Sequence, residues 1–275
     1  MAKVETISGL EERAREIRID ILRMLNAAGS GHTGGSLSCV EILTALYFKV
    51  MRHRPEDPDW KGRDRFVLSK GHAAPTFYAV LAHAGYFDRE ELLTLRKLGS
   101  RLQGHPARGF LPGIEVSTGS LGQGLTMACG IALALRLDDL NTDVYAVLGD
   151  GEVQEGLIWE AAMSAAHRHL DNLCAIIDHN NLQIDGKVEE IKGIEPLEDK
   201  WRAFGWEVFH ANGHDLKDLL DAFDAAKGIK GKPSVIIAKT VKGKGSKLFE
   251  NKVEYHGVAP TDEELKIALK ELGAD

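Results

Sequence analysis

Cysteine and long apolar runs are both scarce in this sequence. Its 275 residues include three cysteines, Cys39, Cys129 and Cys174, which lie far apart and form no CxxC pair. That spacing excludes the usual zinc and redox-dithiol motifs and favours buried thiols in a reducing compartment. There is no apolar run of about 18 residues, as a membrane-spanning helix needs, and the N-terminus lacks the apolar segment of a signal peptide. We therefore expect a cytoplasmic protein without a membrane partner.

Positive charge is also limited. Lysine and arginine together number 34 against 41 acidic residues, which gives a formal net charge of -7. Nucleic acids and anionic membranes require basic surfaces, so we expect no nucleic-acid partner. One basic stretch, residues 227–247, is typical either of a solvated loop or of a site for an anionic ligand. The length and the apolar share of 44% suit one large or two small globular domains.

Helical and extended patterns alternate along the chain. Apolar runs predict strands over residues 65–68, 144–148, 173–178, 207–210 and 234–238. Helical spacing predicts helices over residues 10–25, 37–50, 73–84, 121–140, 152–170 and 216–226, around residue 200, and after a capping box that starts at residue 261. Unbroken apolar strands separated by helices indicate an α/β fold, a doubly wound parallel sheet with helices on both faces. Because ligands bind beyond the carboxyl ends of such strands, the loops there are where we expect functional residues.

Two glycines flank an acidic residue directly after one predicted strand. Gly149 would let the chain turn sharply, and Gly151 would let the backbone approach a ligand closely. The start of the following helix suits phosphate, which Asp150 would repel unless a cation lay between them. Magnesium and calcium prefer such oxygen ligands. The alternative is that Asp150 simply caps the helix.

A second polar turn follows the next predicted strand. Asn180 lies 30 residues after Asp150, about the length of one strand–helix–strand crossover, so the two strand ends would face one another. Its amide oxygen, with a backbone carbonyl from the following loop, would complete the protein's share of a metal site. An Asn-Asn pair by itself is more often only a turn.

Five of the eleven histidines lie in loops, several beside glycine: His32, His72, His105, His214 and His256. A single loop histidine is usually just solvated, but the set suggests close backbone approach to a ligand. None has zinc spacing. The segment 29–34 matches GxGxxG, yet it follows a helix where a dinucleotide site needs a strand, so we expect it to present His32 instead. The turn 117–124 would cradle an anion or a flat ring, and it lacks the lysine of a Walker loop.

Taken together, these motifs resemble the thiamine-diphosphate enzymes, and specifically the N-terminal half of transketolase. The segment from Gly149 to Asn180 looks like that family's cofactor motif. The likeness continues in order through Ser30-Gly31-His32, Ser69-Lys70-Gly71-His72, Gly104-His105-Pro106, the turn 119–124, Gln154-Glu155-Gly156 and the segment 256–260. Ser120 stands where the family often has proline, and we expect little effect from it.

The resemblance implies a role for each matching residue. Asp150, Asn180 and the carbonyl of Leu182 would bind magnesium or calcium. The cofactor-binding residues would be His72, Gly119, Leu121, Gly149, Asp150, Gly151, Asn180, Leu182, Ile184 and His256. Among these, Gly151, His72 and His256 would hold the diphosphate, Gly119 and Leu121 would contact the aminopyrimidine, and Ile184 would pack near the thiazolium. The catalytic residues would be His32, His105 and His256, which would handle sugar hydroxyl protons, and Glu155, which would lie toward a partner protomer.

Complete transketolases are more than twice this long. We therefore expect residues 1–275 to form a single diphosphate-side domain, with the pyrimidine-side and C-terminal domains on a separate C-terminal subunit in a heterotetramer. Together they would move a two-carbon ketol unit between sugar phosphates. Alternatives are a subunit of another thiamine-diphosphate enzyme, such as a 2-oxoacid dehydrogenase α subunit or a deoxyxylulose-phosphate synthase, or a non-catalytic cofactor-binding module. A nicotinamide oxidoreductase would need a glycine fingerprint after a strand, and the sequence has none.

Overall fold

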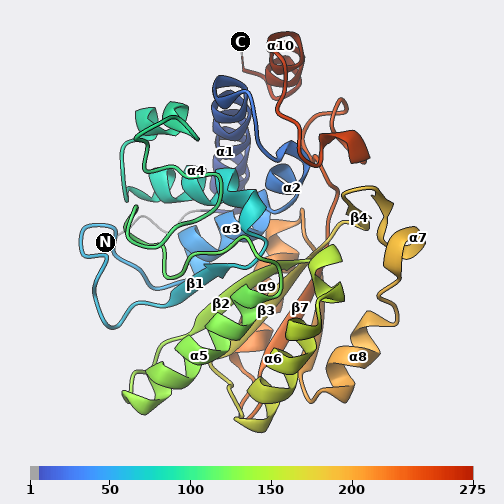
Figure 1. Ribbon diagram of the computed structural model, residues 1–275. Coiled ribbons are helices and arrows are strands. Elements are labelled where there is room, and N and C mark those ends of the chain that lie inside the picture. Colours follow the sequence, from blue (N-terminus) through green and yellow to red (C-terminus); the bar gives the residue numbers. More distant parts are fainter. Residues whose placement is uncertain (1–5, 275) are drawn as a thin grey trace.

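A central parallel sheet organises the protein, whose computed structural model describes residues 6–274. The sheet has the strand order β1-β2-β3-β7-β6 (Figure 1). Its strands are β1 (Arg65–Leu68), β2 (Val144–Gly149), β3 (Leu173–His179), β6 (Glu207–Asn212) and β7 (Ser234–Lys239). Every neighbouring pair is parallel. The predicted α/β class is confirmed, and all five predicted strands are present.

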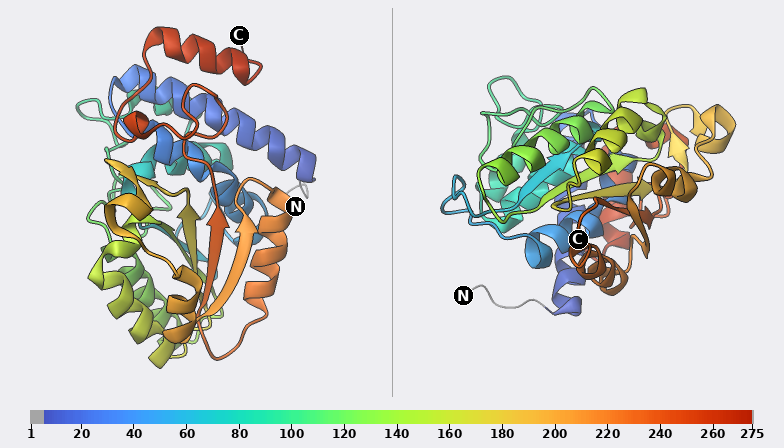
Figure 2. Two further views of the ribbon diagram at one scale, coloured as in Figure 1. Left: turned by 90° about the vertical axis from the view of Figure 1, so that its right-hand side faces the viewer. Right: turned by 90° about the horizontal axis from the view of Figure 1, so that it is seen from below.

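Helices cover both faces of this sheet (Figure 2). One face packs against α1 (Ile7–Ala28), α3 (Val40–Ala45), α4 (Ala74–Ala84) and α9 (Leu216–Lys227). The other packs against α5 (Gln123–Leu137), α6 (Gly156–His167) and α8 (Leu197–Ala203). Alternate residues of β2 supply the two cores, because successive strand side chains point to opposite faces: Tyr145 and Val147 face one layer, and Ala146 and Leu148 face the other.

Shorter elements complete the chain. The remaining helices are α2 (Thr33–Ser38), α7 (Val188–Lys192) and α10 (Asp262–Glu271), and short 3₁₀ helices are η2 (Gly71–Ala73), η3 (Arg89–Thr94), η4 (Gly151–Gln154) and η5 (Val253–Tyr255). The predicted capping box at Thr261 is confirmed, since its hydroxyl and the Glu264 carboxylate each accept a backbone N–H of the other residue. A small antiparallel pair, β4 (Leu182–Gln183) with β5 (Gly186–Lys187), has no counterpart in the prediction.

Three predicted helices are wrong in detail. The amphipathic helix over 37–50 is instead α2, α3 and a π-helical turn η1 (Leu46–Val50), and it is largely buried because α1, α4 and α9 surround α3. Helix α5 ends at Leu137 rather than residue 140, and Leu137 is 78% exposed, so this helix is not buried on most sides. Helix α6 begins at Gly156 rather than residue 152, because Glu152 turns its carboxylate back toward the sheet edge.

Between residues 6 and 274, no helix combines the length and the apolar character required to cross a membrane.

Candidate functional site

The ends of β2 and β3 bring the two predicted polar turns together. These strands are neighbours, with Gly149 in register with Asp178. The Asp150 N–H donates to the Asp178 carbonyl at 3.3 Å, and the Asp150 carboxylate accepts the N–H groups of Gly151 and Asn181. The expected meeting of the Asp150 and Asn180 turns is therefore confirmed. Gly149 and Gly151 keep ordinary negative φ values, so the sharp turn expected at Gly149 needs no left-handed backbone.

A cavity of about 350 Å³ lies at this edge of the sheet. Its lining includes every site residue predicted from the sequence: His32, His72, His105, Gly119, Leu121, Gly149, Asp150, Gly151, Glu155, Asn180, Leu182, Ile184 and His256. These residues come from loops up to 224 positions apart, from His32 to His256. The structure thus gathers them at one place, and their individual roles stay predictions.

Four histidines converge in this cavity. The ring centroid of His32 lies 5.2 Å from that of His72, 5.5 Å from that of His256 and 6.2 Å from that of His105. Gly31, with φ 141°, precedes His32 in a backbone conformation that favours glycine, as expected for a loop that presents this histidine. The fifth loop histidine, His214, does not join them and lines a different cavity.

The cavity histidines are held in their neutral form. Burial, followed by the charges of Arg96 and other basic groups, lowers the pKa of His32 to about 4. Burial and the nearby Lys242 lower the pKa of His256 to about 3. The Nδ1 atom of His32 is buried and has no hydrogen-bond partner among the described residues, which leaves one polar atom available to a ligand.

Two buried lysines bring positive charge to the cavity, and their role was not predicted from the sequence. Lys70 is 1% exposed, forms an ion pair with Asp178 and donates to the Gly35 carbonyl at 2.9 Å. Lys242, also 1% exposed, places Nζ 2.8 Å from His256 Nδ1 and 3.3 Å from the Leu182 carbonyl oxygen. Burial and the charge of Lys70 lower the pKa of Lys242 to about 8. Lys70 belongs to one of the family-like motifs and Lys242 to the basic stretch, but the sequence pattern assigned neither a role.

Glu152 is a further buried group without a predicted role. Its carboxylate accepts the Ser69 hydroxyl, the Gly122 N–H at 2.9 Å and the Gly149 N–H at 3.1 Å. These donors belong to three separate loops that line the cavity or adjoin it. One carboxylate therefore joins the turn after β1, the turn before α5 and the end of β2.

The electrostatics of the cavity suit an anion held through a cation. Burial and the charge of Asp178 raise the pKa of Asp150 to about 6, so its charged form lacks compensation in the protein alone. A divalent cation would supply that compensation, and carboxylate, amide and carbonyl oxygens line the cavity at Asp150, Asn180 and Leu182. Lys70 and Lys242 would attract the phosphate groups. The residues present thus fit a metal ion together with a diphosphate.

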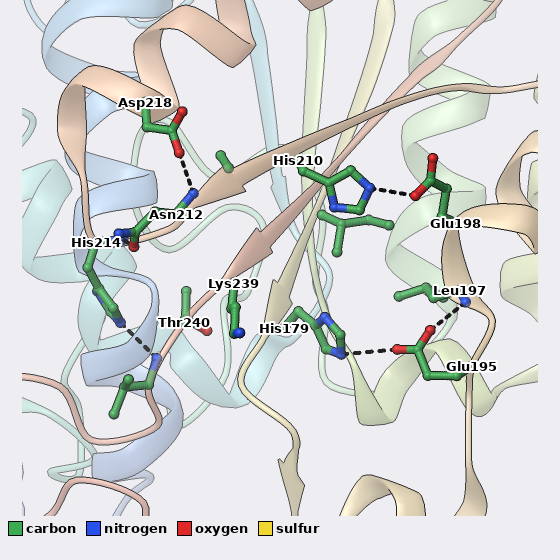
Figure 3. A pocket seen from close by; sticks show the side chains of 13 residues that line it. His179, Glu195, Leu197, Glu198, His210, Asn212, His214, Asp218, Lys239 and Thr240 are labelled. Atoms are coloured by element: carbon green, nitrogen blue, oxygen red, sulfur yellow. Dashed lines mark hydrogen bonds and ion pairs between the residues drawn. The ribbon is translucent and has the colours of Figure 1, made fainter.

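A larger cavity, of about 710 Å³, lies beyond the ends of β3, β7 and β6 (Figure 3). Its polar side chains face one another: His210 Nε2 lies 2.8 Å from Glu198, and His179 Nε2 lies 3.6 Å from Glu195. Glu195, Glu198 and His210 are well exposed. Volume alone would favour this cavity as the functional site. The buried charged groups and imidazoles that meet in the smaller cavity favour that one instead, and we take it as the candidate site.

Comparisons with known proteins identify the family of this chain. The family model described as "Transketolase, thiamine diphosphate binding domain" matches residues 10–275. The chain is 48% identical to the 6-deoxy-6-sulfo-D-fructose transketolase subunit of Clostridium sp. (strain MSTE9), covering 96% of each chain. It is 43% identical to an apulose-4-phosphate transketolase subunit of Phocaeicola vulgatus, over 98% of this chain and 95% of that one.

Solved structures show the same relationship. Transketolase from Campylobacter jejuni superposes with a TM-score of 0.93 at 36% identity, over 98% of this chain and 44% of that one. Transketolase from Leishmania mexicana superposes with a TM-score of 0.92 at 34% identity, over 99% and 42% respectively. The chain spans about two fifths of the length of these enzymes. It therefore belongs to the transketolase family, to which it is related through the thiamine-diphosphate-binding domain.

Proposed function

We propose that this chain holds the diphosphate of thiamine diphosphate through a magnesium or calcium ion, as the N-terminal subunit of a two-chain transketolase. The observation that carries the proposal is the single cavity in which Asp150, Asn180 and Leu182 lie beside two buried lysines and four histidines. Residues 1–275 would form one domain. The pyrimidine-side and C-terminal domains would come from a separate C-terminal subunit.

The cofactor assignment follows from the donors in this cavity. Asp150, Asn180 and the Leu182 carbonyl would ligate the cation, and the Gly151 N–H, His72 and His256 would bind the phosphates, with Gly149 shaping the turn. Gly119 and Leu121 would contact the aminopyrimidine, and Ile184 the thiazolium. Lys242 would add its charge beside His256. When bound, thiamine diphosphate supplies the nucleophilic carbon and the electron sink that ketol transfer requires.

The cavity histidines would bind the substrate and accept protons from it. His32, His105 and His256 would bind sugar hydroxyls, and a neutral imidazole can accept a proton as the carbon–carbon bond breaks. Their pKa values are low in the free chain because they are buried and basic groups surround them. A bound diphosphate would bring negative charge and raise those pKa values toward neutrality, where histidine exchanges protons well.

The proposed partner and substrate rest on the relatives. Two nearly full-length relatives are named as transketolase subunits, which supports a second chain. We propose that the two kinds of chain form a heterotetramer. Glu155 is exposed on the rim of the cavity and would face a partner protomer. The relatives' names mention a sulfonated ketose and a ketose phosphate, and we propose sugar phosphates here. The three buried free cysteines suit the reducing cytoplasm as the place of action.

Two measurements test this proposal. Calorimetric titration of the chain with thiamine diphosphate and magnesium should show stoichiometric binding that is lost with excess chelator. The chain purified together with its natural partner should transfer a ketol unit from a ketose phosphate to an aldose phosphate, whereas the chain alone should not. Pyruvate decarboxylation by the complex would favour a 2-oxoacid enzyme. Cofactor binding without any turnover by the complex would favour a non-catalytic module.

A further inference from the structure

The loop after β7 has no regular secondary structure, yet it holds the buried side chain of Lys242 in place. Residues 240–246 contain no helix or strand, and Lys242 at their centre is 1% exposed, with its ammonium in the small cavity. The loop is tied down on both sides of Lys242. Val241 N–H donates to His214 Nε2 at 2.8 Å, and Gly243 N–H donates to the Gly34 carbonyl at 3.0 Å. The position of Lys242 therefore depends on contacts outside the cavity.

His214 provides the contact that lies next to Lys242 in the chain. It comes from the turn between β6 and α9, and its side chain is only 12% exposed (Figure 3). Because Nε2 accepts the Val241 N–H, the ring proton resides on Nδ1, which lies 2.9 Å from Glu41 Oε2. Both ring nitrogens are thus used, and the tautomer is set by its neighbours.

Glu41 is itself held from the opposite side. Arg18 on α1 reaches Glu41 on α3 at 2.6 Å, and the Arg18 Nε donates to the Lys244 carbonyl at 3.0 Å. Burial opposes the charge of Glu41, but Arg18 and His214 outweigh it and lower the pKa of that carboxyl. His214, Glu41 and Arg18 form a buried bridge that meets the loop at Val241 and again at Lys244. A buried pair of charges needs such added hydrogen bonds to offset its desolvation.

We propose that His214 is a positioning residue, which holds Lys242 in the cavity through the Val241 N–H and thereby increases affinity for an anionic diphosphate ligand. The inference deepens the proposed function and rests on it. His214 lies outside the lining of the small cavity, so its effect on the ligand would pass through the loop.

Two substitutions separate the two bonds of His214. In His214→Gln, the amide oxygen stands where Nε2 was and still accepts the Val241 N–H. In His214→Asn, the shorter amide keeps the contact with Glu41 and leaves the Val241 N–H unpaired. We expect His214→Asn to raise the Kd of the full chain for thiamine diphosphate with magnesium about tenfold, and His214→Gln to raise it less than about threefold. Equal effects, or the reverse order, would overturn the proposal.

A double-mutant cycle tests whether the effect passes through Lys242. In a Lys242→Met background, His214→Asn should add almost nothing to the Kd, because the group that it positions is already gone. Additive losses would show that His214 acts elsewhere. Should His214→Asn fail to fold, Glu41→Asp keeps the charge that faces Arg18 but shortens the reach to His214, and its effect on the Kd should show the same dependence on Lys242.

A matched control separates positioning from general destabilisation. His83 is also buried and bonds a carboxylate, with Nε2 2.8 Å from Asp20, but on α4, outside the lining of both cavities. His83→Asn should lower the melting temperature and leave the Kd unchanged. A wild-type chain that binds no thiamine diphosphate would refute the proposed function itself. A wild-type chain that binds, with His214→Asn equal to wild type, would refute only the role of His214.

Discussion

Two cavities lie at the carboxyl edge of one sheet, and they differ in the exposure and the pairing of the side chains that line them. The larger, beyond β3, β7 and β6, includes exposed side chains that pair with one another, such as His210 with Glu198. The smaller, beside β2 and β3, is lined by buried groups that point inward, including Asp150 at 2% exposure and Lys242 at 1%.

The two cavities also differ in the hydrogen bonds and charges of the residues that line them. In the larger cavity, His210 is hydrogen-bonded to Glu198 and His214 to the Val241 N–H, whereas His179 Nε2 lies 3.6 Å from Glu195 and has no hydrogen-bond partner among residues 6–274. In the smaller cavity, like charges meet, with Asp150 near Asp178 and Lys242 near Lys70. Such repulsion costs stability unless a ligand of opposite charge relieves it, and it therefore marks a binding site better than volume does.

The largest expected effect on cofactor affinity separates the two cavities directly. Asp150→Asn should weaken the binding of thiamine diphosphate with magnesium roughly 100-fold, about 2.7 kcal/mol, because the amide no longer neutralises the cation. Titration calorimetry at fixed magnesium would measure this change. Glu198→Gln, in the larger cavity, is the matched control and should leave the affinity unchanged. Equal losses in both variants would remove the basis for preferring the smaller cavity.

A second prediction concerns the Glu152 carboxylate, which lines the smaller cavity. Glu152→Gln presents an NH₂ group to one of three donors, so a buried N–H or hydroxyl loses its acceptor. We expect the free energy of unfolding to fall by about 1–3 kcal/mol, measured by urea denaturation, together with a weaker affinity for the cofactor. Glu195→Gln in the larger cavity changes an exposed carboxylate and should stay within about 0.5 kcal/mol of wild type. A Glu152→Gln chain as stable as wild type would contradict the idea that this carboxylate stabilises the fold by joining the turn after β1, the turn before α5 and the end of β2.

The sequence predicted the strands and the meeting of the Asp150 and Asn180 turns because both depend on local signals. Apolar runs define β2 and β3, and parallel neighbours must end at the same edge. It did not predict the partners of buried charges. Lys70 meets Asp178 across 108 positions, and Ser69 meets Glu152 across 83, and no local pattern encodes such distances. The late start of α6 has the same origin, since the tertiary contacts of Glu152 override its helical pattern.

A third prediction distinguishes the cation-binding and the histidine parts of the smaller cavity. His32→Ala should leave the affinity for thiamine diphosphate within about threefold of wild type, because His32 is proposed to face the sugar and not the diphosphate. Ketol transfer by the two-chain complex should slow about 10²-fold or more, as general-base losses typically do. Calorimetry and a coupled transfer assay would report the two quantities separately. A large loss of cofactor affinity would move His32 from the substrate to the cofactor.

A fourth prediction is a pH dependence that arises in the smaller cavity. The pKa of His32 is about 4 in the folded chain, below the ordinary value of 6.5. Between these pH values the unfolded chain binds more protons, so the contribution of His32 to the free energy of unfolding should fall as the pH falls from 6.5 toward 4. Histidine NMR titration should find His32 neutral at pH 5, and added thiamine diphosphate with magnesium should raise its pKa. A His32 pKa near 6.5 in the free chain would mean that burial and the basic groups do not lower it. The proposed electrostatic difference between the two cavities would then be contradicted.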